Sequence, residues 1–145
     1  MNGMFKFVMA THGNFAKGIK ESIRLIAGEF ENLETLSCYT EENFNLNTEI
    51  EKILEYKEGE IIVVTDVFGG SVNNAFIEKT AENKNLHVIS GLNLPLMLEL
   101  LGEQEEYTKA EDLIRESIKN TADAVHYGND EMAVSLENEE EDEDF

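Results

Sequence analysis

Residues Glu60 to Thr65 spell EIIVVT, and this stretch decides the fold. The four successive β-branched aliphatic residues from Ile61 to Val64 predict a strand that is buried on both of its faces. Strands of this kind lie at the centre of parallel sheets, because helices cover both faces of such sheets. Gly59 separates the strand from a preceding helical pattern, so the stretch predicts a strand inside an alternating α/β arrangement.

Short apolar runs and helical patterns alternate on both sides of this central strand. The strand–helix repeat predicts an α/β domain with right-handed crossovers and a mainly parallel open sheet that has helices on both faces. Further strands are predicted at Phe5 to Thr11, Leu33 to Cys38 and Leu86 to Ser90, with Ala124 to Tyr127 short enough to be an edge strand. Apolar residues three and four positions apart predict helices from Asn14 to Gly28, around Leu46 to Leu54, from Ser71 to about Asn83, from Pro95, and from Ala110 to Thr121.

The charge of the chain excludes one class of partner. Across 145 residues, 11 Lys and Arg stand against 31 Asp and Glu, which gives a formal charge of −20. Non-specific binding to nucleic acid requires Lys and Arg to neutralise phosphates, so nucleic acid is not an expected partner. From Glu137 to Asp144 the chain spells ENEEEDED without a base. We therefore expect one domain over residues 1–128 and an acidic, disordered tail over 129–145.

The cellular compartment is predicted from three features of the sequence. Cys38 is the single cysteine, which excludes an internal disulfide, and its position near the end of an apolar run predicts a buried thiol in a reducing compartment. The N-terminus lacks the pattern of a signal peptide. No window approaches the roughly 18 uninterrupted apolar residues of a membrane span. A soluble cytoplasmic protein is expected.

Chemistry-bearing residues follow three of the predicted strands. In open parallel sheets, ligands bind beyond the carboxyl ends of the strands, where the strand order reverses. The loops there are Thr11 to Gly13, Asp66 to Ser71, and Gly91 to Pro95. If the first and third strands are neighbours, His12 and Asp66 flank the same crevice.

The combination of these residues fits phosphoryl transfer. A neutral imidazole is a nucleophile near neutral pH, and a carboxylate that accepts a hydrogen bond from Nδ1–H leaves Nε2 free to attack. Gly69, Gly70 and Ser71 lead into a helix, so they offer backbone N–H groups to phosphoryl oxygens. Taken singly, each piece has a structural explanation, such as a hydrogen-bonding histidine or a plain turn. Together, at the strand ends of one sheet, they favour a site.

The chain resembles the IIA component of the mannose/fructose/sorbose class of the bacterial phosphoenolpyruvate-dependent sugar phosphotransferase system. The resemblance covers about the first 100 residues in three ordered motifs. It departs from the family at Val72, where most relatives have proline, and it is loose beyond Leu101. The matching residues are Ala10-Thr11-His12-Gly13 with Phe15-Ala16-Lys17-Gly18, then Val64 to Ser71 with Asn73-Asn74-Ala75, and then Gly91 to Met97.

This resemblance implies a phosphotransferase cycle that needs no cofactor and no metal. It implies that His12 takes a phosphoryl group at Nε2 from the phosphocarrier protein HPr, and that Asp66 orients the imidazole. A histidine of the IIB component then receives the group, and the membrane components IIC and IID import the sugar as it is phosphorylated. The resemblance also implies a homodimer whose subunits exchange an antiparallel C-terminal strand, which corresponds to Ala124 to Tyr127 here.

Three other interpretations remain open at the level of sequence. A phosphoryl-donor subunit of a dihydroxyacetone kinase shares the fold and the histidine, but relatives of that type usually have serine where this chain has Gly13. A non-catalytic module that binds a phosphorylated metabolite also uses Gly-rich turns. A metal-dependent hydrolase is disfavoured because His12 and Asp66 are too few ligands, and neither His87 nor His126 has a helpful spacing.

Overall fold

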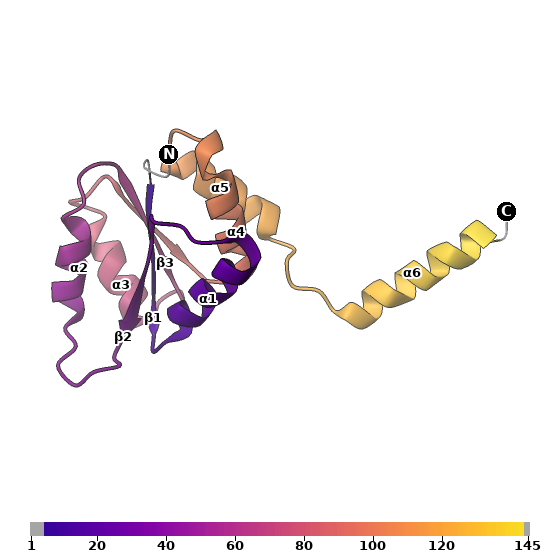
Figure 1. Ribbon diagram of the computed structural model, residues 1–145, viewed down its shortest axis with the longest axis horizontal. Coiled ribbons are helices and arrows are strands. Elements are labelled where there is room, and N and C mark those ends of the chain that lie inside the picture. The colour runs from indigo at the N-terminus through magenta and orange to yellow at the C-terminus, as the bar shows by residue number, and fades with distance from the viewer. Residues whose placement is uncertain (1–4, 144–145) are drawn as a thin grey trace.

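A four-stranded parallel sheet organises the protein, as the computed structural model shows (Figure 1). The structure describes residues 5–143, with side chains as far as residue 139. All three strand pairs are parallel, and the order across the sheet is β2-β1-β3-β4. The predicted central strand is confirmed as β3, which pairs with β1 and β4 on its two sides. The strands are β1 (Phe5–His12), β2 (Leu33–Cys38), β3 (Glu60–Thr65) and β4 (Leu86–Ser90).

Helices cover both faces of this sheet, which confirms the predicted α/β class. Figure 1 shows α2 and α3 on one face, with α1, α4 and α5 on the other. The third helix ends earlier than about Asn83 because Thr80 and Asn83 donate side-chain hydrogen bonds to the carbonyls of Ile77 and Lys79. Over the described residues the helices are α1 (Phe15–Ala27), α2 (Leu46–Leu54), α3 (Ser71–Lys79), α4 (Leu94–Glu103), the short 3₁₀ turn η1 (Gln104–Glu106), α5 (Ala110–Thr121) and α6 (Gly128–Glu143).

The hydrophobic core consists of two layers, one on each face of the sheet. Ile62 and Val64 of β3 pack into the layer of α1, α4 and α5, whereas Ile61 and Val63 pack into the layer of α2 and α3. All four side chains are fully buried. Since full burial of a Val or Ile side chain stabilises by about 1.5–3 kcal/mol, this strand contributes strongly to both layers.

The C-terminal segment differs from two expectations. Residues 124–127 form no strand in the described chain, and β4 has no partner on its outer edge. The antiparallel last strand is therefore absent within one chain. The physical reason is that the segment buries almost no apolar surface against β4, since 98 % of the Val125 side chain is exposed.

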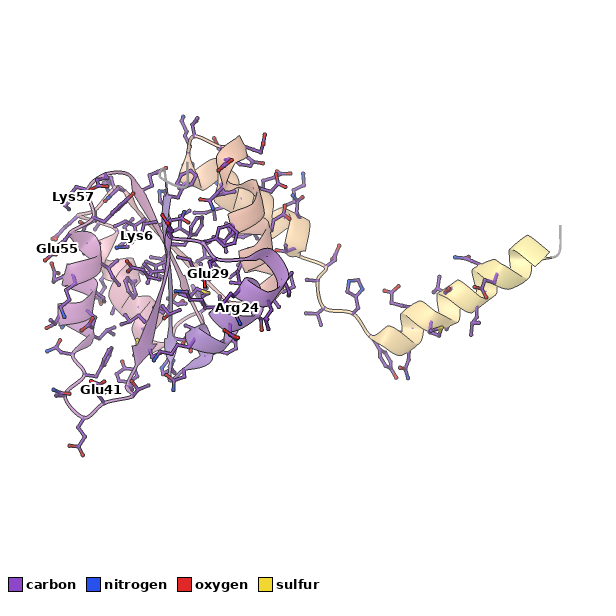
Figure 2. All side chains as sticks on the ribbon, in the orientation of Figure 1. Lys6, Arg24, Glu29, Glu41, Glu55 and Lys57 are labelled. Atoms are coloured by element: carbon purple, nitrogen blue, oxygen red, sulfur yellow. The ribbon has the colours of Figure 1, made fainter. Side chains whose placement is uncertain are left out.

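Residues 129–145 were expected to form a disordered tail; of these, residues 129–143 belong to helix α6 (Gly128–Glu143), which extends away from the sheet (Figure 1 and Figure 2), and residues 144–145 lie outside the described residues. Glu is a good helix former, and Asp130 and Glu131 complement the positive end of the helix dipole. The domain boundary near residue 128 stays a prediction. No helix within residues 5–143 has the length and apolar character that a membrane crossing requires.

Candidate functional site

The strand order places the candidate site between β1 and β3. From β1 the chain continues to β2 on one side and then crosses to β3 on the other, so the order reverses at β1. Ligands bind at such switch points in open parallel sheets. His12 is the last residue of β1 and Asp66 directly follows β3, so the two residues expected to share a crevice are brought together.

A short hydrogen bond joins these two side chains. Nδ1 of His12 lies 3.0 Å from Oδ2 of Asp66, and the same oxygen accepts the backbone N–H of His12 at 2.9 Å. The other carboxylate oxygen, Oδ1, accepts the backbone N–H of Val67 at 3.1 Å. Hydrogen bonds thus fix both oxygens of the carboxylate. It holds the imidazole through Nδ1, so Nε2 carries the lone pair in the neutral ring.

Exposure and charge at the pair also fit a nucleophile. The His12 side chain is 49 % exposed, whereas that of Asp66 is only 12 % exposed. Burial alone raises the pKa of Asp66, but the hydrogen bonds from the backbone and ring of His12, the charge of His12 and the bond from its own loop outweigh burial and hold that pKa below its usual value. Asp66 is therefore an ionised carboxylate that can stabilise a positive imidazole.

Thr11 fixes the local backbone around the histidine. Its Oγ1 accepts the backbone N–H of Ala16 at 3.0 Å and donates to the carbonyl of Gly13 at 3.3 Å. Asn14, the first residue of the predicted helix, occupies the N-cap position but makes no side-chain capping bond. Thr11, a buried strand residue, therefore takes the capping role and ties the start of α1 to the loop that carries His12.

The predicted phosphate-binding turn lies beside the imidazole. Gly69 has φ +80°, a backbone conformation that favours glycine. Gly70 lies against the imidazole, since a Cβ there would make an ordinary van der Waals contact of 3.6 Å with Cε1 of His12. The first bond of α3 runs from the N–H of Asn74 to the carbonyl of Gly70. The N–H groups of the preceding turn from Ser71 onward therefore have no partner inside the helix and form the positive end of its dipole.

One detail of the predicted phosphate site is corrected. The N–H of Gly70 was expected to be unpaired, but it donates to the carbonyl of Val67 at 3.3 Å and closes the turn. The residue that supplies a side-chain hydroxyl here is Ser71. Val72, where the resemblance leads us to expect proline, is fully buried, and α3 begins at Ser71.

The third predicted loop, Gly91 to Pro95, packs against the end of β3 through backbone hydrogen bonds. The backbone N–H groups of Gly91 and Leu92 both donate to the carbonyl of Thr65 at 2.9 Å. This loop therefore closes the end of β3. Within residues 5–143, no group of three or more His, Cys, Asp or Glu side chains is placed to hold a metal ion.

Two further residues lie at the site: Tyr39, which escaped the sequence analysis, and Asn73, which appeared there only within a matching motif and without a role. Tyr39 follows β2 with a left-handed backbone, φ +64°, and its ring centroid lies 5.6 Å from that of His12. Asn73 is buried in the first turn of α3 and its Oδ1 accepts the hydroxyl of Thr65 at 2.8 Å. The one available signal was that Tyr39 immediately follows a predicted strand, at the same edge as the expected site.

Comparison with known proteins shows the family of this chain. The family model of the PTS (phosphotransferase system) fructose IIA component, EIIA-man, matches residues 6–119. The chain belongs to this family. The resemblance to a mannose-class IIA component is thereby confirmed, and components of this kind are phosphotransferase-type proteins.

Two relatives of this IIA component differ in their sugars and domain content. The fructose-specific EIIA component of Bacillus subtilis is 31 % identical over 105 residues, which cover 70 % of this chain and 72 % of the relative. The mannose-specific EIIAB component of Escherichia coli is 27 % identical over 124 residues, which cover 81 % of this chain and 38 % of the relative.

A solved structure shows the same fold. A Klebsiella pneumoniae protein, crystallised as a candidate permease of the phosphoenolpyruvate-dependent sugar phosphotransferase system, has a TM-score of 0.82 and 35 % identity to this chain. The match covers 91 % of this IIA chain and 96 % of the Klebsiella chain. The sheet order and the flanking helices described above are therefore those of solved relatives.

Proposed function

We propose that His12 carries a phosphoryl group between HPr and a IIB component. In the first step, Nε2 of His12 attacks phosphorus, the P–N bond to the histidine of phosphorylated HPr breaks, and a P–N bond to His12 forms. In the second step, the histidine of IIB takes the group and neutral His12 is regenerated. IIB then serves the membrane components IIC and IID, which meet the sugar, so this protein would act in the cytoplasm and handle phosphorus alone.

The single observation that carries this proposal is the 3.0 Å bond between His12 and Asp66 at the switch point. Attack through Nε2 leaves the ring positively charged, and an ionised carboxylate at Nδ1 stabilises that charge. Phosphoryl transfer depends mainly on positioning and on electrostatic stabilisation. The N-terminus of α3 beside the ring supplies the latter for the phosphoryl oxygens.

The surroundings of His12 also suit a protein partner. Four apolar or aromatic side chains close to it in the chain or in space are between about half and three-quarters exposed: Phe15, Tyr39, Val67 and Phe68. Such exposed groups are typical of surfaces that bind other proteins. The EIIAB composition of the Escherichia coli relative supports IIB as one of the partners.

The test measures covalent phosphorylation of the protein. Incubation with phosphoenolpyruvate, enzyme I and HPr should add one acid-labile, base-stable phosphoryl group to this protein and none to His12→Ala. The matched control is His87→Ala, since His87 lies in β4 and its Nε2 bonds Glu60 at 2.8 Å. Label on the His12→Ala protein would refute the assignment. Addition of IIB should then remove the label from the wild-type protein.

We also propose that the protein is a homodimer that exchanges the segment from Ala124 to Tyr127. The edge of β4 is open, and a groove of about 470 Å³ beside it is lined by residues that include Ile89, Ile118 and Val125. A strand from a second copy would pair with β4 and bury the exposed apolar side chains. Light scattering should give the mass of a dimer, and Val125→Asp should give that of a monomer, whereas Glu137→Gln, a change at an exposed position further along α6, should not.

A further inference from the structure

Tyr39 lies between the nucleophile and the helix that is proposed to hold the phosphoryl group. Its ring is tilted by 39° against the imidazole of His12, and its hydroxyl lies 2.9 Å from Oγ of Ser71. Tyr39 therefore contacts both sides of the site, although it comes from β2, the strand that supplies none of the residues predicted to act.

Two contacts and a constrained backbone hold Tyr39 in this position. The carbonyl of Cys38, the residue before it, accepts the N–H of Gly13 at 2.9 Å, so the end of β2 is tied to the loop that carries His12. The ring of Phe44 meets that of Tyr39 edge-on, with centroids 5.4 Å apart. The left-handed backbone at Tyr39 is a conformation that bulky L-residues rarely adopt and that persists where the surroundings enforce it, commonly at functional sites.

The hydroxyl pair has a defined polarity once a phosphoryl group is present. A serine hydroxyl has one proton to donate, and a phosphoryl oxygen only accepts. If Ser71 donates to the phosphoryl oxygen, its own oxygen must act as the acceptor for Tyr39. Successive hydrogen bonds of this kind strengthen one another.

We propose that Tyr39 is a positioning residue that acts through Ser71: its hydroxyl donates to Oγ of Ser71, and Ser71 donates to the phosphoryl group on Nε2 of His12. This inference rests on the proposed phosphorylation of His12. In the free protein the same pair of hydroxyls keeps the Ser71 side chain beside the imidazole, so the donor is in place before phosphorus arrives.

The test uses chemical phosphorylation, so that it does not depend on HPr. Phosphoramidate transfers its phosphoryl group to a histidine nitrogen as its own P–N bond breaks and ammonia leaves. The half-life and the ³¹P chemical shift of the phosphohistidine are then measured in the wild type, Tyr39→Phe, Ser71→Ala and the double variant. Tyr39→Phe keeps the ring and removes the hydroxyl alone. Tyr107→Phe is the control, since Tyr107 lies near α5, whose first residue bonds Glu60 at the opposite end of β3.

We expect the effect of Tyr39→Phe to depend on the presence of the Ser71 hydroxyl. Tyr39→Phe should shorten the half-life by about two- to tenfold, the value of one net hydrogen bond, because the phosphoryl group is held less firmly away from water. In the Ser71→Ala background the same change should have no effect on the half-life or the ³¹P shift. Tyr107→Phe should match the wild type.

Three results would overturn the proposal. Tyr39→Phe could match the wild type, or it could shorten the half-life equally with and without Ser71, which would give Tyr39 a structural role only. A wild-type protein that phosphoramidate does not label at His12 would overturn it as well. A protein labelled by phosphoramidate but not by phosphorylated HPr would instead contradict the proposed function and leave the coupling result standing.

Discussion

Replacement of Asp66 by asparagine should separate two roles of the carboxylate, which are to orient the imidazole of His12 and to stabilise its positive charge. In Asp66, Oδ2 accepts both bonds from His12 and Oδ1 accepts the N–H of Val67. An amide has only one oxygen. If that oxygen faces His12, the amide NH₂ opposes the N–H of Val67. If it faces Val67, the NH₂ opposes the backbone N–H of His12 and favours the ring tautomer that protonates Nε2.

The magnitude follows from these contacts. The first orientation keeps two bonds and loses one, so we expect it to prevail and the protein to fold with Nε2 still unprotonated. The ring then loses an ionised partner, and hydrogen bonds to charged groups contribute about 1.5–3 kcal/mol. Because the imidazole is about half exposed, solvent weakens the effect and the lower part of that range applies. Transfer from phosphorylated HPr should slow by about 10- to 50-fold.

Rapid-quench measurement of label transfer from phosphorylated HPr gives the rate, and ¹⁵N spectra of the imidazole give the tautomer. Asp130→Asn is the matched control, because it removes the same charge from exposed helix α6. A rate for Asp66→Asn within about twofold of the wild type would refute electrostatic stabilisation by this carboxylate. A spectrum with the proton on Nε2 would show that the second orientation prevails and that the slow rate reflects a wrong tautomer.

Three further predictions concern pH, the buried thiol and the exposed aromatic. The pKa of Asp66 is lowered in the folded protein, so its stabilising effect is complete above its unfolded pKa and disappears as pH falls through the folded value. Urea unfolding should therefore show a free-energy gap between the wild type and Asp66→Asn that is constant above about pH 5 and narrows as the pH falls from there through the lowered pKa of Asp66, and a gap that stays constant would contradict the lowered pKa. Burial first, and then the charges of Asp66 and Glu49, raise the pKa of Cys38 to about 12, so iodoacetamide at neutral pH should label it only after denaturation. Phe68→Ala should raise the KM for phosphorylated HPr by about 5- to 30-fold and leave the transfer rate within the complex unchanged, since 77 % of this side chain is exposed beside the site. A fall in that rate with KM unchanged would place Phe68 in the chemical step.

Much of the fold could be predicted from sequence because burial leaves a periodic signal. The β-branched run from Ile61 to Val64 predicted a strand covered on both faces, and the structure buries all four residues. The helix from Ala110 to Thr121 was predicted with its observed bounds, since apolar residues three and four apart mark one buried face. The juxtaposition of His12 and Asp66 followed from one further step, the rule that places sites at the carboxyl ends of parallel strands.

The features that could not be predicted depend on tertiary contacts, which leave no periodic pattern in the sequence. Tyr39 reaches the site through a left-handed backbone and an edge contact with Phe44, and neither is visible in the residue pattern. The capping of α1 by Thr11 comes from a buried strand residue, whereas sequence rules look for a cap directly before the helix. The segment from Ala124 to Tyr127 has the composition of a strand, but within one chain it pairs with no strand, and composition does not say whether a segment reaches the open edge of β4.

The geometry of the site is set by the register of the sheet. His12 lies opposite Cys38 in the β1–β2 ladder, and Ala10 lies opposite Thr65 in the β1–β3 ladder. Tyr39 is therefore one residue beyond the level of His12, and Asp66 is one residue below it on the other side. Adjacent strands are about 4.8 Å apart, so Tyr39 and Asp66, which directly follow β2 and β3, both reach the imidazole of His12. A shift of one residue in either ladder would turn the side chain at the strand end to the opposite face. The same buried strand residues that stabilise the core therefore fix the distance from His12 to Asp66, and changes to them should alter phosphoryl transfer before they unfold the protein.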